Sequence, residues 1–374
     1  MRVLLVRLSS LGDVLHTLPA ITDLQRNGKD VELDWLIEPA FAPIARWHPG
    51  VREVLPFSLR SRQGGLGTLL GQLRELRRQL RTQRYDLVLD SQGLFKSALL
   101  ARLAGTTVAG LSPRSAREPL ATYLYGQRHA VPWGPTAIQR NRELFAQVFA
   151  SPRPSGLADF GLQKQAVSWR AENLALAAGK DALPFVLGLH ATSRAWQNKE
   201  WPLRHWITLA HSLADAGYDL ALPAMGAREQ ERVATIAAAA DNVRALPQMD
   251  LEGLGQVMLQ ARAFVGMDTG LSYLAAALGL AGVTLYGPTP RTSAYSAIRR
   301  RLGLAGVTLY GPTASEQENM PGSAQAILQS TENCAPCGST RCRRIHQPEE
   351  PIPCQEGMQP TMVWERLAPL LERL

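Results

Sequence analysis

The chain has 374 residues, enough for two domains of about 150 residues each. Hydrophobic residues make up 45% and charged residues 19%, which excludes a disordered chain and a fibrous repeat. The 40 Lys and Arg exceed the 32 Asp and Glu by eight, so phosphates, nucleotides or a membrane surface are favoured partners. This excess is spread along the chain without a clustered basic and aromatic motif, so no nucleic-acid partner is expected.

No targeting segment is visible at the start. The first apolar run is interrupted by Arg7 and closed by Asp13, and it lacks a small-residue cleavage site. The longest stretch without a formal charge, residues 269–290, contains four glycines and two prolines, which is unlike a membrane span. We therefore expect a cytoplasmic protein.

The first half alternates strands and helices. In chain order, the hydrophobic pattern predicts a strand at 3–6, a helix at 14–24, strands at 31–37 and 54–59, a helix at 65–83 and a strand at 85–89. The last strand ends in the loop 90–93 (DSQG), and another helix follows. Strands that alternate with helices in this way indicate βαβ units and a parallel sheet.

A Pro- and Gly-rich segment at 151–156 is the best candidate linker, and the alternation restarts beyond it. Strands are predicted at 185–189, 218–222, 263–266 and 283–286, and helices at 202–216, from 229 and at 271–278. The chain is thus α/β, with two doubly wound parallel-sheet (Rossmann-like) domains facing a cleft. We expect an N-terminal domain at 1–160, a second domain at 161–355, and a C-terminal helix at 356–374 that packs back on the first domain.

Twelve residues occur twice without change, at 278–289 and at 302–313. Two copies are too few for a solenoid, so we interpret them as a local tandem duplication. The first copy is expected to be the core strand because it directly follows the helix 271–278. The second copy is then an insertion.

All the cysteines fall within 21 residues near the end: Cys334, Cys337, Cys342 and Cys354. Four thiolates at such spacing can hold a structural zinc, although the four-residue gap is not a common ribbon spacing. Redox or disulfide pairs and plain free thiols are the alternatives that the sequence leaves open.

Several motifs together resemble the glycosyltransferase family 9 heptosyltransferases. They lie at residues 6–19, 90–97, 116–120, 190–193, 199–202, 268–272 and 286–289, so the resemblance covers roughly residues 1–295 in order. It implies a GT-B fold and transfer of L-glycero-D-manno-heptose from ADP-heptose to the Kdo of the lipopolysaccharide inner core, with inversion. It also implies Kdo-lipid A as acceptor, an anionic inner-membrane surface as partner, and a peripheral position on its cytoplasmic side. No cofactor is expected to be required, and no Asp-x-Asp metal loop is present.

An inverting transfer needs a base for the acceptor hydroxyl and stabilisation of the departing diphosphate. Asp13 closes a Ser-Ser-Leu-Gly loop at the start of a helix, and the resemblance places the general base there. Its structural alternative is an aspartate that caps the helix. Ser10 belongs to the same loop on the acceptor side, and His16 lies one helical turn further on.

The resemblance assigns the donor to the second domain. Thr192, Ser193 and Lys199 are expected at the diphosphate, where hydroxyls and a cation suit phosphate. Glu229 matches a residue near the ribose and adenine, and Met249 matches an adenine contact. The structural alternatives are a first-turn acid that complements the helix dipole for Glu229, and core packing for Met249.

The strongest donor motif is the strand end at Asp268. The resemblance gives Asp268 contact with the heptose, and gives Thr269 and Gly270 contact with the diphosphate. Helix capping is the structural alternative. The family usually has His three residues beyond this glycine, whereas this chain has Tyr273, which donates one hydrogen bond but carries no charge near neutral pH.

Basic residues of the first domain match acceptor-side positions of the family: Arg60, Arg62 and Arg117. The helix 65–83 also carries arginines away from its leucine face, at positions 74, 77, 78 and 81. Such a face suits an anionic leaflet, and a solvated charged surface is the plainer interpretation.

Three other functions remain open at this stage. One is a sibling transferase that adds the next heptose, or another family 9 enzyme. A second is a sugar-nucleotide epimerase, which needs acids flanking the sugar, and none besides Asp13 stands out. The third is an inactive paralogue that binds a nucleotide sugar, which Tyr273 and the duplication favour.

Overall fold

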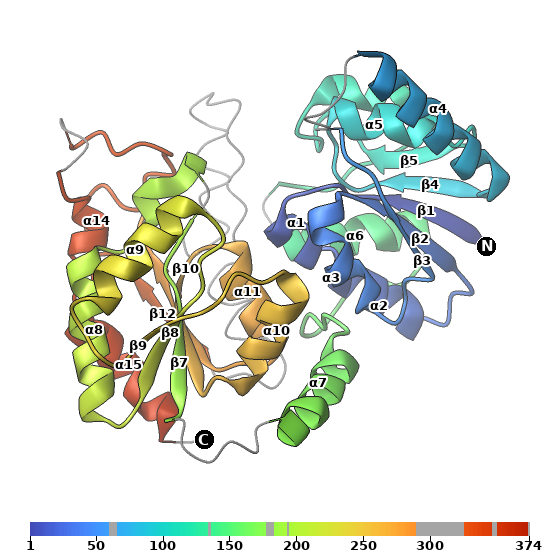
Figure 1. Ribbon diagram of the computed structural model, residues 1–374. Coiled ribbons are helices and arrows are strands. Elements are labelled where there is room, and N and C mark those ends of the chain that lie inside the picture. Colours follow the sequence, from blue (N-terminus) through green and yellow to red (C-terminus); the bar gives the residue numbers. More distant parts are fainter. Residues whose placement is uncertain are drawn as a thin grey trace. The chain divides into compact units, whose positions relative to one another are not determined.

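The computed structural model describes residues 1–59, 66–133, 136–176, 183–192, 194–288, 325–345 and 350–372. Within these residues the chain divides into two compact units, Met1–Gly161 and the part from Leu162 onward (Figure 1). Each unit is described by itself. Arg60, Arg62, Ser193 and the second copy of the duplication lie outside the described residues.

The first unit contains a six-stranded parallel sheet with the order β3-β2-β1-β4-β5-β6. Its strands are short and mostly buried, as expected for a sheet covered on both faces. They are β1 (Arg2–Val6), β2 (Glu32–Ile37), β3 (Glu53–Pro56), β4 (Leu87–Asp90), β5 (Val108–Leu111) and β6 (Gln127–His129).

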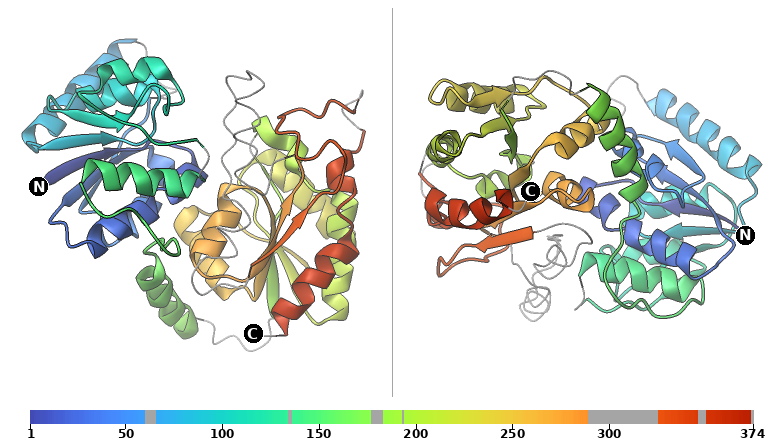
Figure 2. Two further views of the ribbon diagram at one scale, coloured as in Figure 1. Left: turned by 180° about the vertical axis from the view of Figure 1, so that it is seen from behind. Right: turned by 90° about the horizontal axis from the view of Figure 1, so that it is seen from below.

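Helices cover both faces of this sheet, α4 and α5 on one side and α2, α3 and α6 on the other (Figures 1 and 2). In α4 the predicted leucine face buries Leu76 and Leu80, whereas Leu70 is 45% exposed. The helices are α1 (Leu11–Leu15), α2 (Leu18–Arg26), α3 (Ala42–Arg46), α4 (Leu66–Thr82), α5 (Phe95–Arg102) and α6 (Ala137–Val148), with 3-10 turns η1 (Pro39–Phe41) and η2 (Pro119–Leu124).

The second unit repeats the topology. Its sheet order is β12-β11-β10-β7-β8-β9, all parallel, which is the order of the first sheet read in the opposite direction. The strands are β7 (Phe185–Leu189), β8 (Asp219–Leu222), β9 (Val243–Ala245), β10 (Ala263–Met267), β11 (Gly282–Tyr286) and β12 (Gln325–Gln329). Two doubly wound units with this strand order confirm the predicted fold class.

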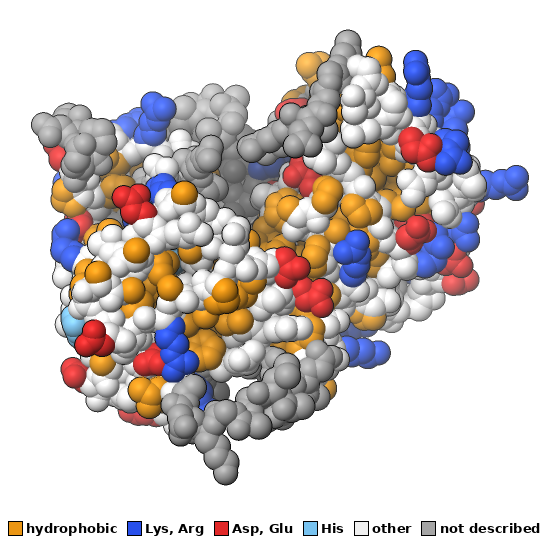
Figure 3. All heavy atoms as spheres, in the orientation of Figure 1, with side chains coloured by type: hydrophobic (Ala, Val, Ile, Leu, Met, Phe, Trp, Pro, Cys, Tyr) orange, Lys and Arg blue, Asp and Glu red, His pale blue; other side chains and the backbone are white. Residues whose placement is uncertain are grey.

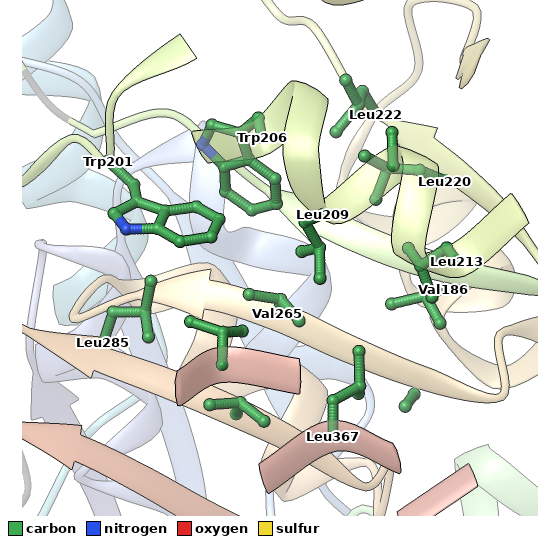
Figure 4. Packing of buried hydrophobic residues seen from close by; sticks show 14 of the residues in the cluster. Val186, Trp201, Trp206, Leu209, Leu213, Leu220, Leu222, Val265, Leu285 and Leu367 are labelled. Carbon is green, nitrogen blue, oxygen red and sulfur yellow. The ribbon is translucent and has the colours of Figure 1, made fainter. Parts of the chain in front are cut away.

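The core of the second unit lies between this sheet and the helices α8 and α15. Trp201 and Trp206 meet edge to face with ring centroids 5.2 Å apart, and leucines from strands and helices close around them (Figure 4). The helices are α7 (Gln163–Leu176), α8 (Leu203–Asp215), α9 (Ala227–Ala237), α10 (Leu251–Gln260), α11 (Gly270–Ala277), α14 (Pro353–Glu356) and α15 (Pro360–Leu371), with the 3-10 turn η3 (Arg194–Lys199).

The last helix differs from our expectation. Instead of packing on the first unit, α15 contacts α8 and the strands β10, β11 and β12 of the second. Val363 and Leu367 are fully buried in that core, and the indole N–H of Trp201 donates to the carbonyl of Met358 at 2.8 Å. In the chain, α15 follows β12 and α14. It therefore covers the part of the second sheet, β10 to β12, to which β12 itself belongs.

The first copy of the duplicated segment forms β11, directly after α11 and between β10 and β12, as expected. Its Gly282 has no room for a side chain, because an added Cβ would lie 2.2 Å from the ring of Phe264. The same strand continues to Tyr286, whose phenol lies in the candidate site described below. None of the described helices has the length and apolar character that a bilayer span requires.

Candidate functional site

Asp13 lies in the short helix α1, just beyond the carboxyl end of β1. Its side chain is buried, and Oδ2 accepts hydrogen bonds from the backbone N–H and the hydroxyl of Ser10, both at 3.1 Å. Oδ1 is also buried but has no hydrogen-bond donor among the described residues. One carboxylate oxygen is therefore held in place, while the other is open to accept a proton. Asp13 also serves the start of its helix, so the capping role is present as well.

Arg117 lines a small hollow that opens to solvent in the first unit. We call it the first-unit pocket. Its polar lining comes from the ends of β1, β4 and β5 and from α6, and includes Arg7, Ser91, Gln92, Arg117, Arg140 and Asn141. This position, beyond the carboxyl ends of parallel strands, is where open α/β sheets bind ligands.

Thr192 follows β7 and is tied to Glu200, an acid that the sequence analysis did not assign. Its backbone N–H donates to Glu200 Oε1 at 3.3 Å, and its hydroxyl lies 2.8 Å from the carbonyl of Trp196 and 3.2 Å from Glu200 Oε1, either of which can accept its proton. Glu200 is buried and also accepts a two-bond contact from Arg228 on α9. The Thr192 loop is thus anchored to α9 by an ion pair in which Glu200 is buried and Arg228 is partly exposed.

Lys199 and Asp268 form a buried ion pair. The ammonium donates to Asp268 Oδ2 at 2.7 Å and to the carbonyl of the same residue at 3.0 Å. It also lies 4.4 Å from the ring centre of Trp196. The two residues expected to contact different parts of the donor therefore contact each other here. Since an ammonium has three N–H donors, one beyond these two remains.

Tyr273 contacts the Asp268 side of this pair. Its hydroxyl donates to Asp268 Oδ1, and it is 3.3 Å from the hydroxyl of Tyr286 on β11. Burial, and after it the negative charge of Asp268, raises the pKa of Tyr273 well above its ordinary value of 10.0. The phenol is therefore a neutral donor throughout the physiological pH range, and the Asp268 carboxylate is fixed from two sides.

Thr269 and Gly270 lie where β10 gives way to α11. Thr269 is the N-cap residue of α11 and Gly270 its first residue. The Thr269 hydroxyl oxygen is buried and has no hydrogen-bond partner among the described residues. A buried hydroxyl without a partner next to free helix amides is suited to an oxyanion.

Glu229 and Met249 have structural roles in this state. The Glu229 carboxylate accepts the backbone N–H of Met225 at 2.6 Å, which supports the start of α9. Met249 is half-buried, with its side chain beside Gly253 at the start of α10. Neither residue has a hydrogen bond to the Lys199–Asp268 pair, so their donor roles remain predictions.

None of the four cysteines forms a disulfide bond in the described part of the chain. Burial, and after it the charges of Cys337, Cys342 and Cys334, raises the pKa of Cys354 to about 12. That cysteine is therefore a thiol near neutral pH when it has no metal ligand role. In the part of the chain that the structure describes, no group of three or more Cys, His, Asp and Glu is arranged to hold a metal ion, and a structural zinc at these cysteines stays a prediction.

Comparison with known proteins shows the family to which the chain belongs. The sequence profile of glycosyltransferase family 9 (heptosyltransferase) matches residues 73–304. The lipopolysaccharide heptosyltransferase 1 of Pseudomonas aeruginosa is 39% identical over 355 residues, which cover 94% of this chain and 89% of that protein. The chain belongs to glycosyltransferase family 9.

Two further family members support the assignment. The lipopolysaccharide heptosyltransferase 1 of Escherichia coli is 39% identical over 292 residues, covering 77% of this chain and 88% of that protein. The solved structure of E. coli heptosyltransferase WaaC with ADP-2-deoxy-2-fluoro heptose has a TM-score of 0.75 at 31% identity, and the match covers 99% of both chains. The fold class and the glycosyltransferase activity predicted from the motifs are thereby confirmed.

Proposed function

We propose that this chain transfers L-glycero-D-manno-heptose from ADP-heptose to a Kdo residue of the lipopolysaccharide inner core, with inversion at the anomeric carbon. The observation that carries the proposal is the convergence of Lys199, Asp268 and Thr269 at one edge of the second sheet. This edge is the switch point between β7 and β10, and the relative solved with an ADP-heptose analogue has the same fold.

In the donor site, the cationic and hydrogen-bond-donating groups bind the diphosphate, and the carboxylate binds the heptose. The third N–H of Lys199, the Thr269 hydroxyl and the first amides of α11 stabilise the negative charge that grows on the departing diphosphate. Asp268, fixed by Lys199 and Tyr273, accepts hydrogen bonds from heptose hydroxyls. Both partners of the ion pair thus keep donors or lone pairs for the sugar nucleotide while they hold each other. We assign no metal or other cofactor to this chemistry.

Asp13 completes the reaction. As the acceptor oxygen forms its bond to the anomeric carbon, its proton passes to the open Oδ1 of Asp13. The bond between the anomeric carbon and the β-phosphate oxygen breaks on the opposite face, and ADP leaves with the electron pair. Bond formation opposite to the leaving group inverts the configuration. A positioned carboxylate base contributes about 10²- to 10⁴-fold to such a step.

Mass spectrometry of the acceptor tests the function directly. The purified chain is incubated with ADP-heptose and, in parallel, with Kdo-lipid A or with an acceptor that already carries one heptose. We expect one heptose to be added to the first acceptor only. Addition to the second acceptor alone would make the chain the sibling transferase, heptosyltransferase II. ADP-heptose binding without transfer to either acceptor would make it an inactive paralogue.

We also propose that the chain works on the cytoplasmic face of the inner membrane. Lys and Arg side chains gather over α4 (Figure 3), including exposed Arg74, Arg77 and Arg81. The neighbouring elements α5 and η2, which pack together, expose four large apolar side chains by 46% to 74%. They are Phe95, Leu99, Leu120 and Tyr123. Apolar side chains near a basic helix suit an anionic leaflet.

Vesicle sedimentation tests this second proposal. We expect the chain to sediment with phosphatidylglycerol vesicles at low salt, and the Leu120→Ser/Tyr123→Ser variant to sediment several-fold less. Equal sedimentation of the variant, or of the chain with neutral vesicles, would contradict it.

A further inference from the structure

The first-unit pocket lies at the place that corresponds to the donor residues in the second unit. Arg7 directly follows β1 and Ser91 directly follows β4, and these strands are neighbours with Val6 opposite Asp90. The strand order reverses between β1 and β4, as it does between β7 and β10. Ligands of doubly wound sheets bind at this switch point, yet neither Arg7 nor Ser91 has a role in the steps described above.

Arg7 is a buried cation without a counter-ion. Its side chain is buried at 4% exposure, and no carboxylate pairs with it among the described residues. Its Nε donates to the Thr17 hydroxyl and its Nη2 to Asn141 Oδ1, both at 3.3 Å and both neutral. Burial of an unpaired charge is costly, so an anion is the expected partner. The Nη1 hydrogens and one Nη2 hydrogen have no acceptor among these contacts.

Ser91 gives an independent indication. Its hydroxyl oxygen is buried, lies in the pocket lining and has no hydrogen-bond partner in the described part of the chain. The adjacent Asp90 is not the missing counter-ion of Arg7, since its carboxylate accepts from the Tyr125 and Ser97 hydroxyls and from backbone amides. Arg140, held over the Trp133 ring at 3.9 Å, adds positive charge to the lining.

We propose that the first-unit pocket binds the carboxylate of the acidic acceptor sugar. The planar carboxylate lies against the open Nη edge of Arg7 and accepts a further hydrogen bond from the Ser91 hydroxyl, which is the geometry that guanidinium groups favour. This inference rests on the proposed function, under which the acceptor sugar is Kdo, an acid.

Hydrogen bonds also connect the first-unit pocket to the helix that carries the proposed base, Asp13. The Thr17 hydroxyl that accepts from Arg7 donates to the backbone carbonyl of Asp13 at 2.9 Å, and Asn141 donates to the carbonyl of His16 at 3.1 Å. Arg7 is therefore a positioning residue: it binds the carboxylate and is tied to the helix that carries Asp13. Its loss is expected to act mainly on the acceptor KM.

The test compares an acceptor acid with its ester. The deacylated mono-Kdo acceptor and its Kdo methyl ester differ only in the negative charge that the pocket is proposed to bind. With the native chain we expect an acceptor KM about tenfold or more higher for the ester. In Arg7→Gln the two KM values are expected to come within about twofold of each other, with the ADP-heptose KM unchanged.

Two further variants make the result interpretable. Ser91→Ala removes a hydroxyl that has no partner among the described residues, so it is expected to fold normally and to show reduced discrimination, even if Arg7→Gln is unstable. Arg46→Gln changes an exposed arginine of the same unit outside the pocket and should discriminate like the native chain. Equal KM values for acid and ester in the native chain, or full discrimination in Ser91→Ala and Arg7→Gln, would overturn the proposal.

Calorimetry separates this proposal from the proposed function. Free Kdo is expected to bind the native chain and to lose binding in Arg7→Gln, whereas binding of inorganic phosphate in place of Kdo would overturn the carboxylate assignment. Transfer without acid–ester discrimination would support the proposed function and contradict carboxylate binding in the first-unit pocket. Arg7-dependent Kdo binding without transfer would support carboxylate binding in the first-unit pocket and contradict the proposed function.

Discussion

Tyr273 occupies a position where the family resemblance leads us to expect histidine. Its hydroxyl donates to Asp268, which is also paired with Lys199. The sequence singled out these three residues separately but not their mutual contacts, because Lys199 and Asp268 are 69 positions apart. The Tyr286 phenol, which completes the cluster, was given no role in the site, although residue 286 begins one of the family motifs. A polar ring at the end of a buried strand was the available signal.

Replacement of Tyr273 by Phe should weaken donor binding. The change removes one hydrogen bond to a buried carboxylate, worth about 1.5–3 kcal/mol. We therefore expect the ADP-heptose KM to rise by about tenfold or more, while the acceptor KM stays unchanged. Tyr218→Phe, a half-buried tyrosine of the same unit outside this cluster, is the matched control. If both variants bind the donor like the native chain, the phenol does not position Asp268.

The loop between β4 and α5 is held by a residue far along the chain, Tyr125, through its hydrogen bond to Asp90. Asp90 is fully buried, and its burial raises its pKa, while hydrogen bonds from Tyr125, Ser97 and the loop amides oppose that rise. The Tyr125 ring lies flat against Gly110 on β5, where an added Cβ would come within 2.6 Å of a ring carbon. Because Gly110 on β5 has no side chain, the Tyr125 phenol can reach the Asp90 carboxylate. That carboxylate in turn accepts hydrogen bonds from the amides of the loop after β4.

Gly110→Ala should therefore destabilise the chain by about 3 kcal/mol, as overpacking and the displaced phenol combine. Because Ser91 and Gln92 lie in the same loop, the acceptor KM should rise too. Gly71→Ala is the control: this exposed glycine of α4 has nothing within 4 Å of an added Cβ, and the change should stabilise by about 1 kcal/mol. Chemical denaturation of both variants measures this. Equal stabilities would refute the packing argument.

Sequence periodicity predicted the central elements better than the peripheral ones. Strands β1, β4, β7 and β10 are apolar runs that end in polar loops, and both switch points could be placed from them. The edge strands β6 and β9 were missed, because three residues such as Gln127–His129 carry no recognisable alternation. Candidate residues such as Asp13 and Asp268 were singled out at strand ends, whereas Arg7 was noted only as an interruption of an apolar run inside a family motif, with no role assigned to it.

At the scale of the whole molecule, two units with one strand order repeat a single plan, and each places its polar side chains beyond strand ends. The two-domain α/β fold followed from the alternation and the family motifs. The packing of α15 did not, since an amphipathic helix does not specify which sheet it covers. Its burial against β10 to β12 was decided by tertiary contacts with Trp201 and α8.

The most direct test is ADP release from ADP-heptose with a Kdo-lipid A acceptor by the native chain, Asp13→Asn and Asp250→Asn. Both aspartates lie at helix starts, and Asp250 accepts the backbone N–H of Gly253 at 2.8 Å, a role that asparagine can fill. We predict release that needs both substrates, a loss of about 10²-fold or more in Asp13→Asn, and native activity in Asp250→Asn. Native rates in a folded Asp13→Asn variant would contradict the account.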